Sequence, residues 1–206
     1  MAVQVKICGI KAPDTLNAAI VEGARFIGFV FYPPSPRHID IDTSKELILK
    51  LPTGVRSVGL FVDPTDEQLD NVLAHSPLDM IQLHGHETVM RTEQIKQKYA
   101  LPIIKAFHVA NVKDIEKAKS YENIVDWLLF DSPTGGSGQS FDWKLLKGIE
   151  FSKPWMLSGG LTTENVKQAL EVLSPNAMDV SSGVETRRGV KCPNKIKQFI
   201  KSCRYS

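Results

Sequence analysis

The strongest constraint on the fold is an alternation that runs through all 206 residues. Short apolar runs, rich in the β-branched and aromatic residues that favour strands, are each followed by a segment with helical periodicity. The eight runs are residues 3–8, 26–32, 55–62, 80–84, 103–108, 127–131, 155–158 and 177–181. Strands that alternate with helices in this way are typical of a parallel sheet.

Residues that favour helix ends mark where the intervening helices start. The candidate N-caps are Thr43 or Ser44, Thr65, and Thr162 or Thr163. Pro13 with Asp14 and Pro193 with Asn194 are expected to open the first and last helices, because proline is tolerated in a first helical turn. The chain is therefore predicted to contain eight strand–helix units.

Eight consecutive strand–helix units predict an α/β fold, a closed (β/α)8 TIM barrel. No shift in composition marks a domain boundary, so residues 1–206 are expected to form a single (β/α)8 barrel catalytic domain. A doubly wound open sheet is the alternative, although it usually has fewer strands and needs a reversal of strand order. In a barrel, functional side chains lie at the C-terminal ends of the strands.

Charge and cysteine content restrict the class of protein. A net charge of +2 provides no strong field for holding nucleic acid or a membrane surface. Cys8, Cys192 and Cys203 are widely separated and lack metal-binding spacing, which indicates a reducing compartment. No signal peptide is evident, and no apolar run approaches the roughly 20 residues that span a bilayer. We expect a cytoplasmic protein whose partner is a small molecule.

Two late segments carry a phosphate-binding pattern. In LSGGLTTENV a strand leads through Gly159 and Gly160 to a helix start, and in MDVSSGVE a strand precedes Ser181, Ser182 and Gly183. Barrels commonly bind phosphate with main-chain N–H groups of the loops after strands seven and eight. The alternative is that the glycines only allow tight turns, but both segments fall in the expected pair of loops.

Cys8 and Asp131 stand at two other strand ends. A lone cysteine on an apolar strand is commonly an inert packing residue, but Cys8 lies at the expected barrel mouth and precedes a glycine. Asp131 ends the apolar run WLLFDS, where a carboxylate must be solvated, hydrogen-bonded or used in chemistry. Capping of the following loop is the alternative role for Asp131.

Three other segments have functional and structural interpretations. The proline-rich PPSPRHI loop holds Arg37, and its stiffness favours a grip on a carboxylate or phosphate over an ordinary surface position. His84 and His86 would share one strand face, but no third or fourth metal ligand is evident, which favours a pocket-lining role for His84. The glycine-rich residues 135–143 form either a lid or a plain linker.

Together these motifs resemble the phosphoribosylanthranilate isomerase family of tryptophan biosynthesis. The matching segments cover nearly the whole chain and are VKICGI, GFVFYPPSPRHI, VGLFVD, QLHGHE, LLFDS, GGSGQSFDW, LSGGLTTENV and DVSSGVE. The resemblance implies a (β/α)8 barrel that performs an Amadori rearrangement with no metal or organic cofactor. Cys192 departs from the family pattern, because relatives commonly have an acidic residue there.

The resemblance also implies roles for individual residues. Cys8 is the expected general base, Asp131 the general acid, and Arg37 the group that holds the anthranilate carboxylate. The residues expected around the phosphate are Gly159, Gly160, Ser181, Ser182 and Gly183, with Asp179 at the border of the same pocket.

The expected chemistry depends on how these groups are tuned. A thiol ionises closer to neutral pH than a hydroxyl, so Cys8 suits a base. Lys6 is expected on the opposite strand face, away from this thiol. Apolar surroundings are expected to raise the pKa of Asp131 and keep part of the population protonated.

Other phosphate-binding barrels are the alternatives. The sister Amadori isomerase of histidine biosynthesis would have an aspartate in place of Cys8 and a two-fold sequence repeat. A ribulose-phosphate epimerase would need a complete metal site. Indole-glycerol-phosphate synthase would need a catalytic lysine early in the barrel. A non-catalytic metabolite-binding barrel is the alternative from another class, but Cys8, Arg37 and Asp131 together argue against it. A monomer is preferred over a homodimer.

Overall fold

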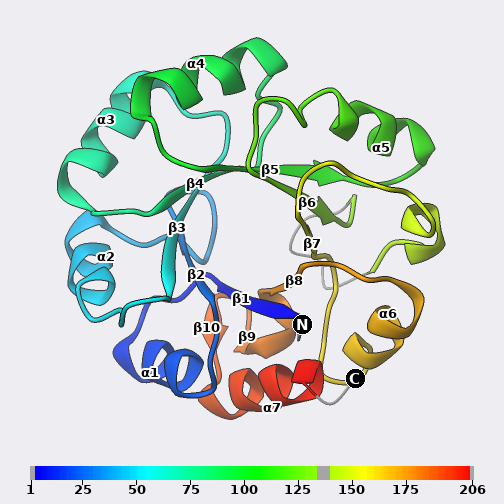
Figure 1. The fold of residues 1–206 in the computed structure, drawn as a ribbon. Helices are drawn as coiled ribbons and strands as arrows, with labels where there is room; N and C mark the ends of the chain where they lie inside the picture. Colours follow the sequence, from blue (N-terminus) through cyan, green and yellow to red (C-terminus); the bar gives the residue numbers. More distant parts are fainter. Residues whose placement is uncertain (1–2, 134–139, 205–206) are drawn as a thin grey trace.

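The computed structural model describes residues 3–133 and 140–204 and contains a closed barrel of eight parallel strands (Figure 1). The strands pair in chain order, and the last pairs with the first. They are β1 (Gln4–Cys8), β2 (Phe26–Val30), β3 (Arg56–Phe61), β4 (Met80–Leu83), β5 (Ile103–His108), β6 (Trp127–Asp131), β7 (Trp155–Leu157) and β8 (Ala177–Val180). The predicted TIM barrel is confirmed, and the open sheet is excluded.

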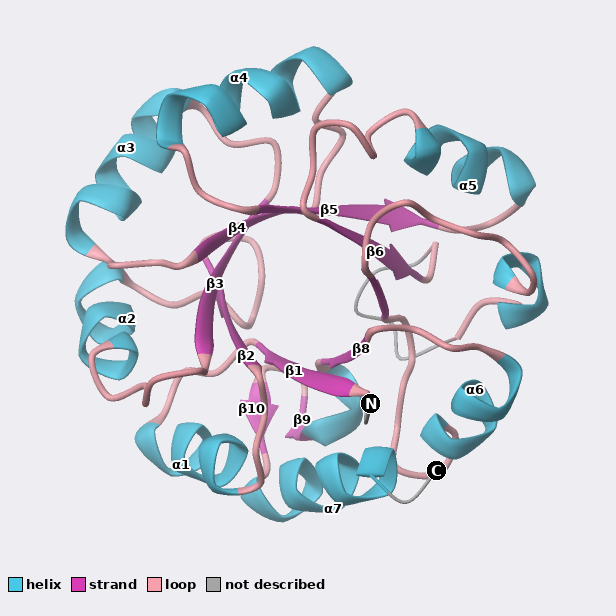
Figure 2. Cartoon of the chain, in the orientation of Figure 1, coloured by secondary structure: helices cyan, strands magenta, loops and turns pink. Residues whose placement is uncertain are grey.

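Helices surround the ring of strands on the outside (Figure 2). The α-helices of the described residues are α1 (Pro13–Val21), α2 (Ile41–Ile48), α3 (Asp66–His75), α4 (Val89–Tyr99), α5 (Val112–Lys119), α6 (Val166–Val172) and α7 (Pro193–Arg204). The prediction of a helix in every unit is wrong after β6, where the described part of the connection holds only the short 3-10 helix η1 (Trp143–Leu146).

An unpredicted segment lies between β8 and the last helix. It consists of the 3-10 helix η2 (Ser182–Val184) and the antiparallel pair β9 (Glu185–Arg187) and β10 (Val190–Lys191). Strands of two and three residues leave little periodicity in the sequence, so no pattern indicated them. This hairpin supplies several side chains to the site described below.

The helix starts follow the sequence in part. Thr65 caps α3 in a reciprocal capping box, and α1 and α7 begin at Pro13 and Pro193 as expected. The expected caps Thr43 or Ser44 are wrong, because Asp40 caps α2 and its carboxylate accepts bonds from the Thr43 N–H and hydroxyl, both at 2.8 Å.

The start of α6 is also later than predicted from Thr162 or Thr163. Asn165 is the N-cap residue, and its side chain faces backwards along the chain: Oδ1 accepts from the Thr162 N–H at 2.8 Å and Nδ2 donates to the Gly160 carbonyl at 2.9 Å. The residues between them form a turn, which delays the first helical residue to Val166.

Side chains from alternate strand positions fill the barrel. The interior cluster contains Phe26, Val58, Met80, Ile104, Ala106, Leu129, Met156 and Ala177. A larger apolar layer lies between the strands and the helices and includes residues of the opposite strand face such as Ile7, Ile27 and Phe130. The interior cluster fills the barrel below the strand ends, and the cavity described below lies above it at the mouth.

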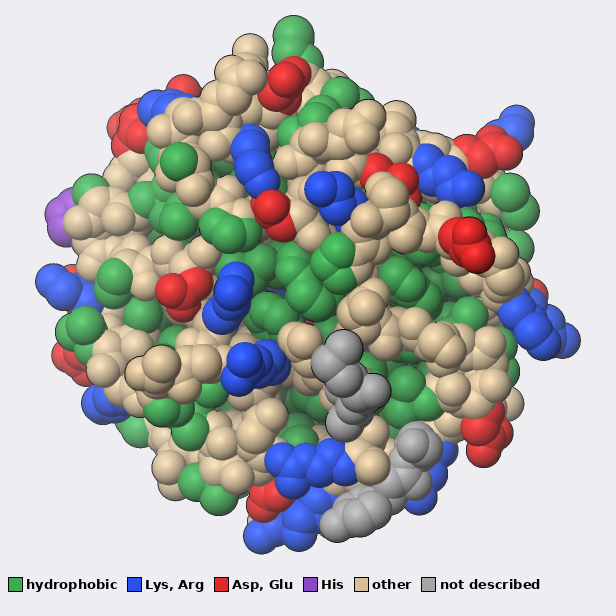
Figure 3. Space-filling view, viewed as in Figure 1, with side chains coloured by type: hydrophobic (Ala, Val, Ile, Leu, Met, Phe, Trp, Pro, Cys, Tyr) green, Lys and Arg blue, Asp and Glu red, His purple; other side chains and the backbone are tan. Residues whose placement is uncertain are grey.

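Charged side chains of both signs are distributed over the face of the molecule that looks onto the barrel in Figure 3. On the face that Figure 3 shows, acidic and basic side chains are interspersed and neither sign dominates. Among the described residues, no helix combines the length and the apolar character that crossing a membrane requires.

The correction at α2 generates a stability prediction. Asp40→Ala removes the acceptor for two first-turn bonds and should lower the free energy of unfolding by about 0.5–2 kcal/mol, as N-cap losses do. Urea denaturation measures the effect. Asp42→Ala, in the first turn of the same helix but not at its N-cap, is the matched control and should cost clearly less. Equal losses in the two variants would contradict the assignment of the cap.

Candidate active site

A cavity of about 330 Å³ opens at the strand ends, and several predicted site residues meet there. Cys8, Arg37, Asp131, Asp179 and Ser181 line it. His84, which was expected to line a pocket, does so as well. Gly159, Gly160, Ser182 and Gly183 are not among the lining residues but lie within two positions of a lining serine, Ser158 or Ser181. Of the glycine-rich loop at 135–143, residues 135–139 lie outside the described part of the chain, so its lid or linker role stays untested.

The thiol of Cys8 lies beside a buried ion pair. Lys6 is fully buried, and its Nζ is 2.9 Å from Oδ1 of Asp179. The expectation that Lys6 faces away from Cys8 is wrong, because strand positions two apart share a face and both side chains therefore point inward. The Lys6 ammonium acts directly on the thiol: burial raises the pKa of Cys8, whereas the charge of Lys6 lowers it and only partly offsets the burial.

The Lys6 charge itself is stable in this environment. Burial favours the neutral amine, but Asp179 and Cys8 outweigh it, and the pKa of Lys6 lies above its usual value. Ser158 adds a longer contact, with its hydroxyl 3.4 Å from Asp179 Oδ2. The Lys6 side chain therefore carries a positive charge next to the Cys8 thiol.

Asp131 is paired with a histidine rather than isolated in apolar surroundings. Its Oδ2 lies 3.2 Å from Nε2 of His84, and its Oδ1 accepts a 2.7 Å bond from the Ser132 N–H. Burial would raise the pKa of Asp131, but these bonds and the charge of His84 outweigh it and the net shift is downward. The expected rise is therefore wrong, and the carboxylate form is favoured in the free protein.

Gln82 contacts the ring of His84 through its side-chain amide. Its side chain is fully buried inside the barrel, and Nε2 is 2.8 Å from Nδ1 of His84. With the amide in this orientation Nδ1 accepts and Nε2–H donates to Asp131, which fixes the tautomer of His84. The Gln82 Oε1 atom is buried and has no hydrogen-bond partner among the described residues.

Arg37 is anchored by a carboxylate from the β9–β10 hairpin. Its Nε and Nη2 donate to Glu185 at 2.7 and 3.0 Å, and Lys191 donates to the same carboxylate at 2.7 Å. This pairing uses one edge of the planar guanidinium and leaves the Nη1 edge for a second anion. Burial raises the pKa of Glu185, but the hydrogen bond from Arg37 and the charge of Lys191 outweigh it and the pKa is lowered.

The hairpin is also joined to the first strand. Lys191 donates to the Ser181 hydroxyl at 3.0 Å, and that hydroxyl donates to the carbonyl oxygen of Cys8 at 3.2 Å. Ser181 thus connects the base candidate on β1 to the loop that follows β8. Its hydroxyl also lines the cavity, where it can meet a ligand.

The two glycine segments lie against each other and against Asp131. A Cβ at Gly159, where φ is +84°, would lie 2.5 Å from the Ser132 nitrogen and 3.0 Å from Oδ1 of Asp131. A Cβ at Gly183 would lie 1.9 Å from the carbonyl oxygen of Leu161. Only glycine fits at either position, so the glycines allow both tight turns and the close approach of the loops.

Main-chain donors in these loops are available to an anion. The N–H groups of Gly160, Ser182 and Gly183 make no hydrogen bond to another of the residues that the structure describes. Such groups beside positive φ glycines are typical of phosphate cradles. The Arg188 side chain, on the turn of the β9–β10 hairpin, lines the cavity and adds a positive charge.

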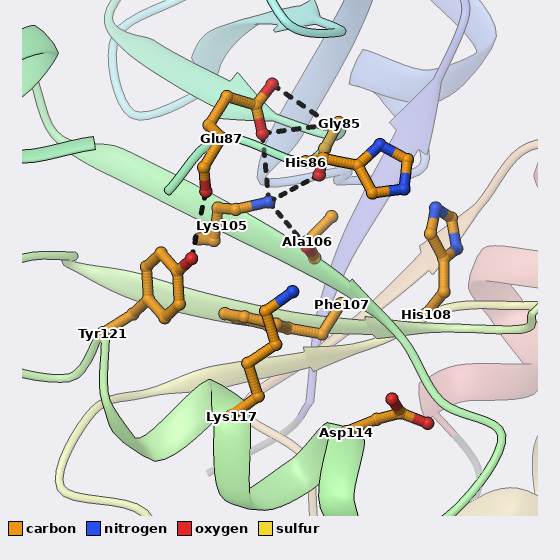
Figure 4. A pocket seen from close by; sticks show the side chains of 10 residues that line it. All are labelled: Gly85, His86, Glu87, Lys105, Ala106, Phe107, His108, Asp114, Lys117 and Tyr121. Atoms are coloured by element: carbon orange, nitrogen blue, oxygen red, sulfur yellow. Dashed lines mark hydrogen bonds and ion pairs between the residues drawn. The ribbon is translucent and has the colours of Figure 1, made fainter. Parts of the chain in front are cut away.

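A second cavity of about 230 Å³ lies behind β5 and shares His108 with the first (Figure 4). Its main polar feature is a buried ion pair between Lys105 and Glu87 at 3.0 Å. Glu87 also accepts from the main-chain N–H groups of Asp63 and Gly85. The pair fixes the loop after β4, which begins with His84.

The expectation that His86 shares a strand face with His84 is wrong, because the His86 side chain is 90 % exposed.

Sequence reasoning missed several residues around the cavity. Gln82, His108, Glu185, Arg188 and Lys191 were assigned no role. His108 ends β5 and was identifiable by its position alone, and Gln82 is a polar residue inside an apolar strand run. The hairpin residues had no such signal, because their place follows from two-residue strands that the sequence does not mark.

Comparisons with known proteins agree with this geometry. A sequence model of the N-(5'-phosphoribosyl)anthranilate (PRA) isomerase family matches residues 5–202. The N-(5'-phosphoribosyl)anthranilate isomerase of Paracoccus denitrificans is 49 % identical over 97 % of this chain and 96 % of its own length, and that of Paramagnetospirillum magneticum is 47 % identical over 99 % and 98 %.

Solved structures of the same kind of enzyme superpose closely. The phosphoribosyl anthranilate isomerase of Thermotoga maritima has a TM-score of 0.91 at 39 % identity and covers 99 % of this chain and 100 % of its own. A phosphoribosyl anthranilate isomerase in complex with reduced 1-(o-carboxyphenylamino)-1-deoxyribulose 5-phosphate has a TM-score of 0.87 at 36 % identity, with the same coverage.

The Lys6–Asp179 pair generates a second stability prediction. Lys6→Met leaves the Asp179 carboxylate buried without its partner and should lower the free energy of unfolding by about 3–5 kcal/mol. Urea unfolding followed by circular dichroism measures the loss. Lys6→Met combined with Asp179→Asn removes the unpaired charge and should regain part of it. A single variant as stable as the parent would show that the pair is not needed for folding.

Proposed function

The chain belongs to the N-(5'-phosphoribosyl)anthranilate isomerase family, and on that premise we propose that Cys8 and Asp131 are the base and the acid of its reaction. The chain is an enzyme of tryptophan biosynthesis that converts N-(5'-phosphoribosyl)anthranilate into 1-(2-carboxyphenylamino)-1-deoxyribulose 5-phosphate by an Amadori rearrangement. The observation that carries the proposal is that the thiol and the carboxyl group open onto the same cavity.

Ring opening requires a proton at the furanose oxygen, and Asp131 supplies it. The free protein favours the ionised carboxylate, because His84 and the Ser132 N–H both bond to it. A substrate that carries a phosphate and a carboxylate brings negative charge into the cavity and displaces water, and both effects raise the pKa of Asp131. Protonation of the ring oxygen then gives an open-chain iminium ion.

The second step is removal of the C2 proton by Cys8. The positive iminium nitrogen makes this proton acidic, and the thiolate of Cys8 takes it to give an enolamine, which becomes the aminoketose when it is protonated at C1. Burial opposes ionisation of this thiol, whereas the Lys6 ammonium favours it. Lys6 is a positioning residue here: it touches no substrate atom and acts through the charge of the base.

Arg37 is the group that binds the anthranilate carboxylate. Glu185 holds the guanidinium by its Nε and Nη2 edge, so the side chain does not lose further rotamer freedom when substrate arrives. The Nη1 edge then forms charge-assisted bonds to the carboxylate. Fixing this end of the substrate orients the sugar between Cys8 and Asp131.

The phosphate lies at the loops after β7 and β8. The supporting features are the N–H groups of Gly160, Ser182 and Gly183, which have no partner among the residues that the structure describes, the tight approach at Gly159, and the Ser181 hydroxyl. Asp179 borders this region. Its carboxylate is paired with Lys6, so its negative charge is compensated near the phosphate.

Other properties complete the proposal. Residues 1–206 form one catalytic barrel domain, located in the cytoplasm, with the phosphorylated substrate as the partner. A monomer is the proposed oligomeric state, although a Thermotoga maritima relative is described as a dimeric enzyme from which monomers were generated. The substrate site lies inside one barrel mouth, so one copy of the chain contains every residue assigned above.

The acid–base assignment predicts severe losses of turnover. Cys8→Ala and Asp131→Asn should each lower kcat by about 100- to 10,000-fold, the usual contribution of a positioned acid or base. Turnover is followed as the loss of anthranilate fluorescence from freshly made phosphoribosylanthranilate. Cys192→Ala is the matched thiol control and should retain parental kcat, with circular dichroism checking that each variant is folded. Near-parental kcat in the Cys8 or Asp131 variant would refute the role of that residue.

The carboxylate assignment predicts a binding effect. Arg37→Ala should lower kcat/KM by about 10- to 100-fold, mainly through KM, because a hydrogen bond to a charged group contributes about 1.5–3 kcal/mol. Arg37→Lys keeps the charge but loses the planar fork, and it should restore the activity only in part. Arg187→Ala, an exposed arginine on the neighbouring hairpin strand, is the control. An unchanged KM in Arg37→Ala would exclude the residue from the carboxylate site.

A further inference from the structure

Three side chains at the cavity form a cluster that the reaction does not require as a cluster. His84, His108 and Asp131 each offer a ligand atom, and these atoms all lie within 4.8 Å of one another. Two of them, His84 Nε2 and Asp131 Oδ2, are 3.2 Å apart, close to the spacing of neighbouring ligands around a metal ion with bonds of about 2 Å. The two imidazole rings are 5.3 Å apart between centroids and nearly perpendicular, at 73°.

Each of the three groups has the outer contact that metal ligands usually have. His108 Nδ1 lies 3.0 Å from the Ser132 carbonyl, so Nδ1 donates there and the Nε2 lone pair is left for a metal. Asp131 Oδ1 is held by the Ser132 N–H, which leaves Oδ2 as the ligand atom. A metal ligand rarely occurs without such a partner, and here all three have one.

The third partner is Gln82, whose side-chain amide contacts the His84 ring and can turn to accept a proton from it. When His84 Nε2 binds a metal, the proton moves to Nδ1 and needs an acceptor. The Gln82 amide lies 2.8 Å from Nδ1, and its Oε1 is buried with no partner among the described residues. Rotation of the amide by half a turn brings Oε1 to Nδ1, where it accepts that proton, and moves the amide nitrogen to the buried position that Oε1 held.

The cluster opens to solvent on one side. All three side chains line the open cavity, so the remaining coordination positions can be filled by water. Two imidazoles and one carboxylate on one side of an open site are a set typical of Zn²⁺, Co²⁺ or Fe²⁺.

We propose that His84, His108 and Asp131 bind a divalent transition-metal ion and that this ion inhibits the isomerase. Coordination occupies the Asp131 oxygen that otherwise bonds to His84 and prevents that carboxyl group from carrying a proton to the substrate. The ion is therefore an inhibitor and not a cofactor. The binding depends only on the geometry of the three residues, whereas the inhibition also rests on the proposed role of Asp131.

Cys8 is the main competitor for such an ion, because its sulfur opens onto the same cavity. The two sites differ in their ligands, since only the thiol would give a sulfur-to-metal charge-transfer band. Burial raises the pKa of Cys8 and disfavours the thiolate that a metal needs, whereas the His84, His108 and Asp131 cluster already has its three ligand atoms close together.

Cobalt(II) spectroscopy on the full chain, without substrate, tests the binding. Titration of Co²⁺ should give visible d–d bands that saturate at one ion per chain, both in the parent and in Cys8→Ala. His84→Ala and His108→Ala should abolish the bands, and Gln82→Met should weaken the affinity by about 10- to 100-fold, as loss of an outer contact does. His86→Ala, an exposed imidazole on the same loop, should bind like the parent. Bands that survive in both histidine variants, or disappear in Cys8→Ala, would overturn the proposal.

A second measurement tests the inhibition. Zn²⁺ should abolish most of the isomerase activity of the parent, and excess EDTA should restore it. Zn²⁺ should no longer inhibit His108→Ala, the variant in which the Co²⁺ bands are lost. Because this variant keeps the Cys8 thiol, that result would exclude inhibition through Cys8. Spectroscopic binding at the cluster with undiminished turnover would overturn the inhibitory half of the proposal and would count against Asp131 as the proton donor, while absence of binding would leave the proposed function untouched.

Discussion

The buried ion pair between Lys6 and Asp179 joins the first strand of the barrel to the last. These residues are register partners of β1 and β8, so the pair closes the ring with a side-chain contact in addition to the main-chain bonds. The same ammonium favours the thiolate of Cys8, two residues along β1. One charge therefore takes part both in closing the barrel and in lowering the pKa of the thiol that we propose as the base.

The two groups that we propose as base and acid rest in the opposite protonation states from those the proposed chemistry uses. The free protein favours a thiol at Cys8 and a carboxylate at Asp131. The reacting form has a thiolate and a carboxylic acid, which is the same number of protons arranged differently. On the proposed roles, the enzyme therefore does not need to gain or lose a proton to become competent, because one proton has only to move from the sulfur to the carboxylate.

The sequence predicted the barrel well because its signals are local and repeat eight times. Strand runs and residues such as Thr65 and Pro13 depend only on neighbours in the chain. The errors arose where partners are remote: the pKa of Asp131 depends on His84, which comes from another strand, and the anchoring of Arg37 depends on Glu185, 148 residues away. Lys6 was misplaced for a different reason, since strand alternation alone puts it on the same face as Cys8. The chemical roles remain predictions, because proximity in a cavity does not establish a reaction step.

The position of the barrel seam also matters while the chain is being made. Lys6 and Cys8 are synthesised close together, but Asp179, the counter-ion of Lys6, lies 173 residues after Lys6 in the chain. The loops after β7 and β8 and the hairpin that holds Arg37 emerge in the same final stretch. A growing chain therefore cannot complete this site until β8 and the hairpin have been made, and a product cut short before β8 would carry the Cys8 thiol without the ion pair and the hairpin that surround it.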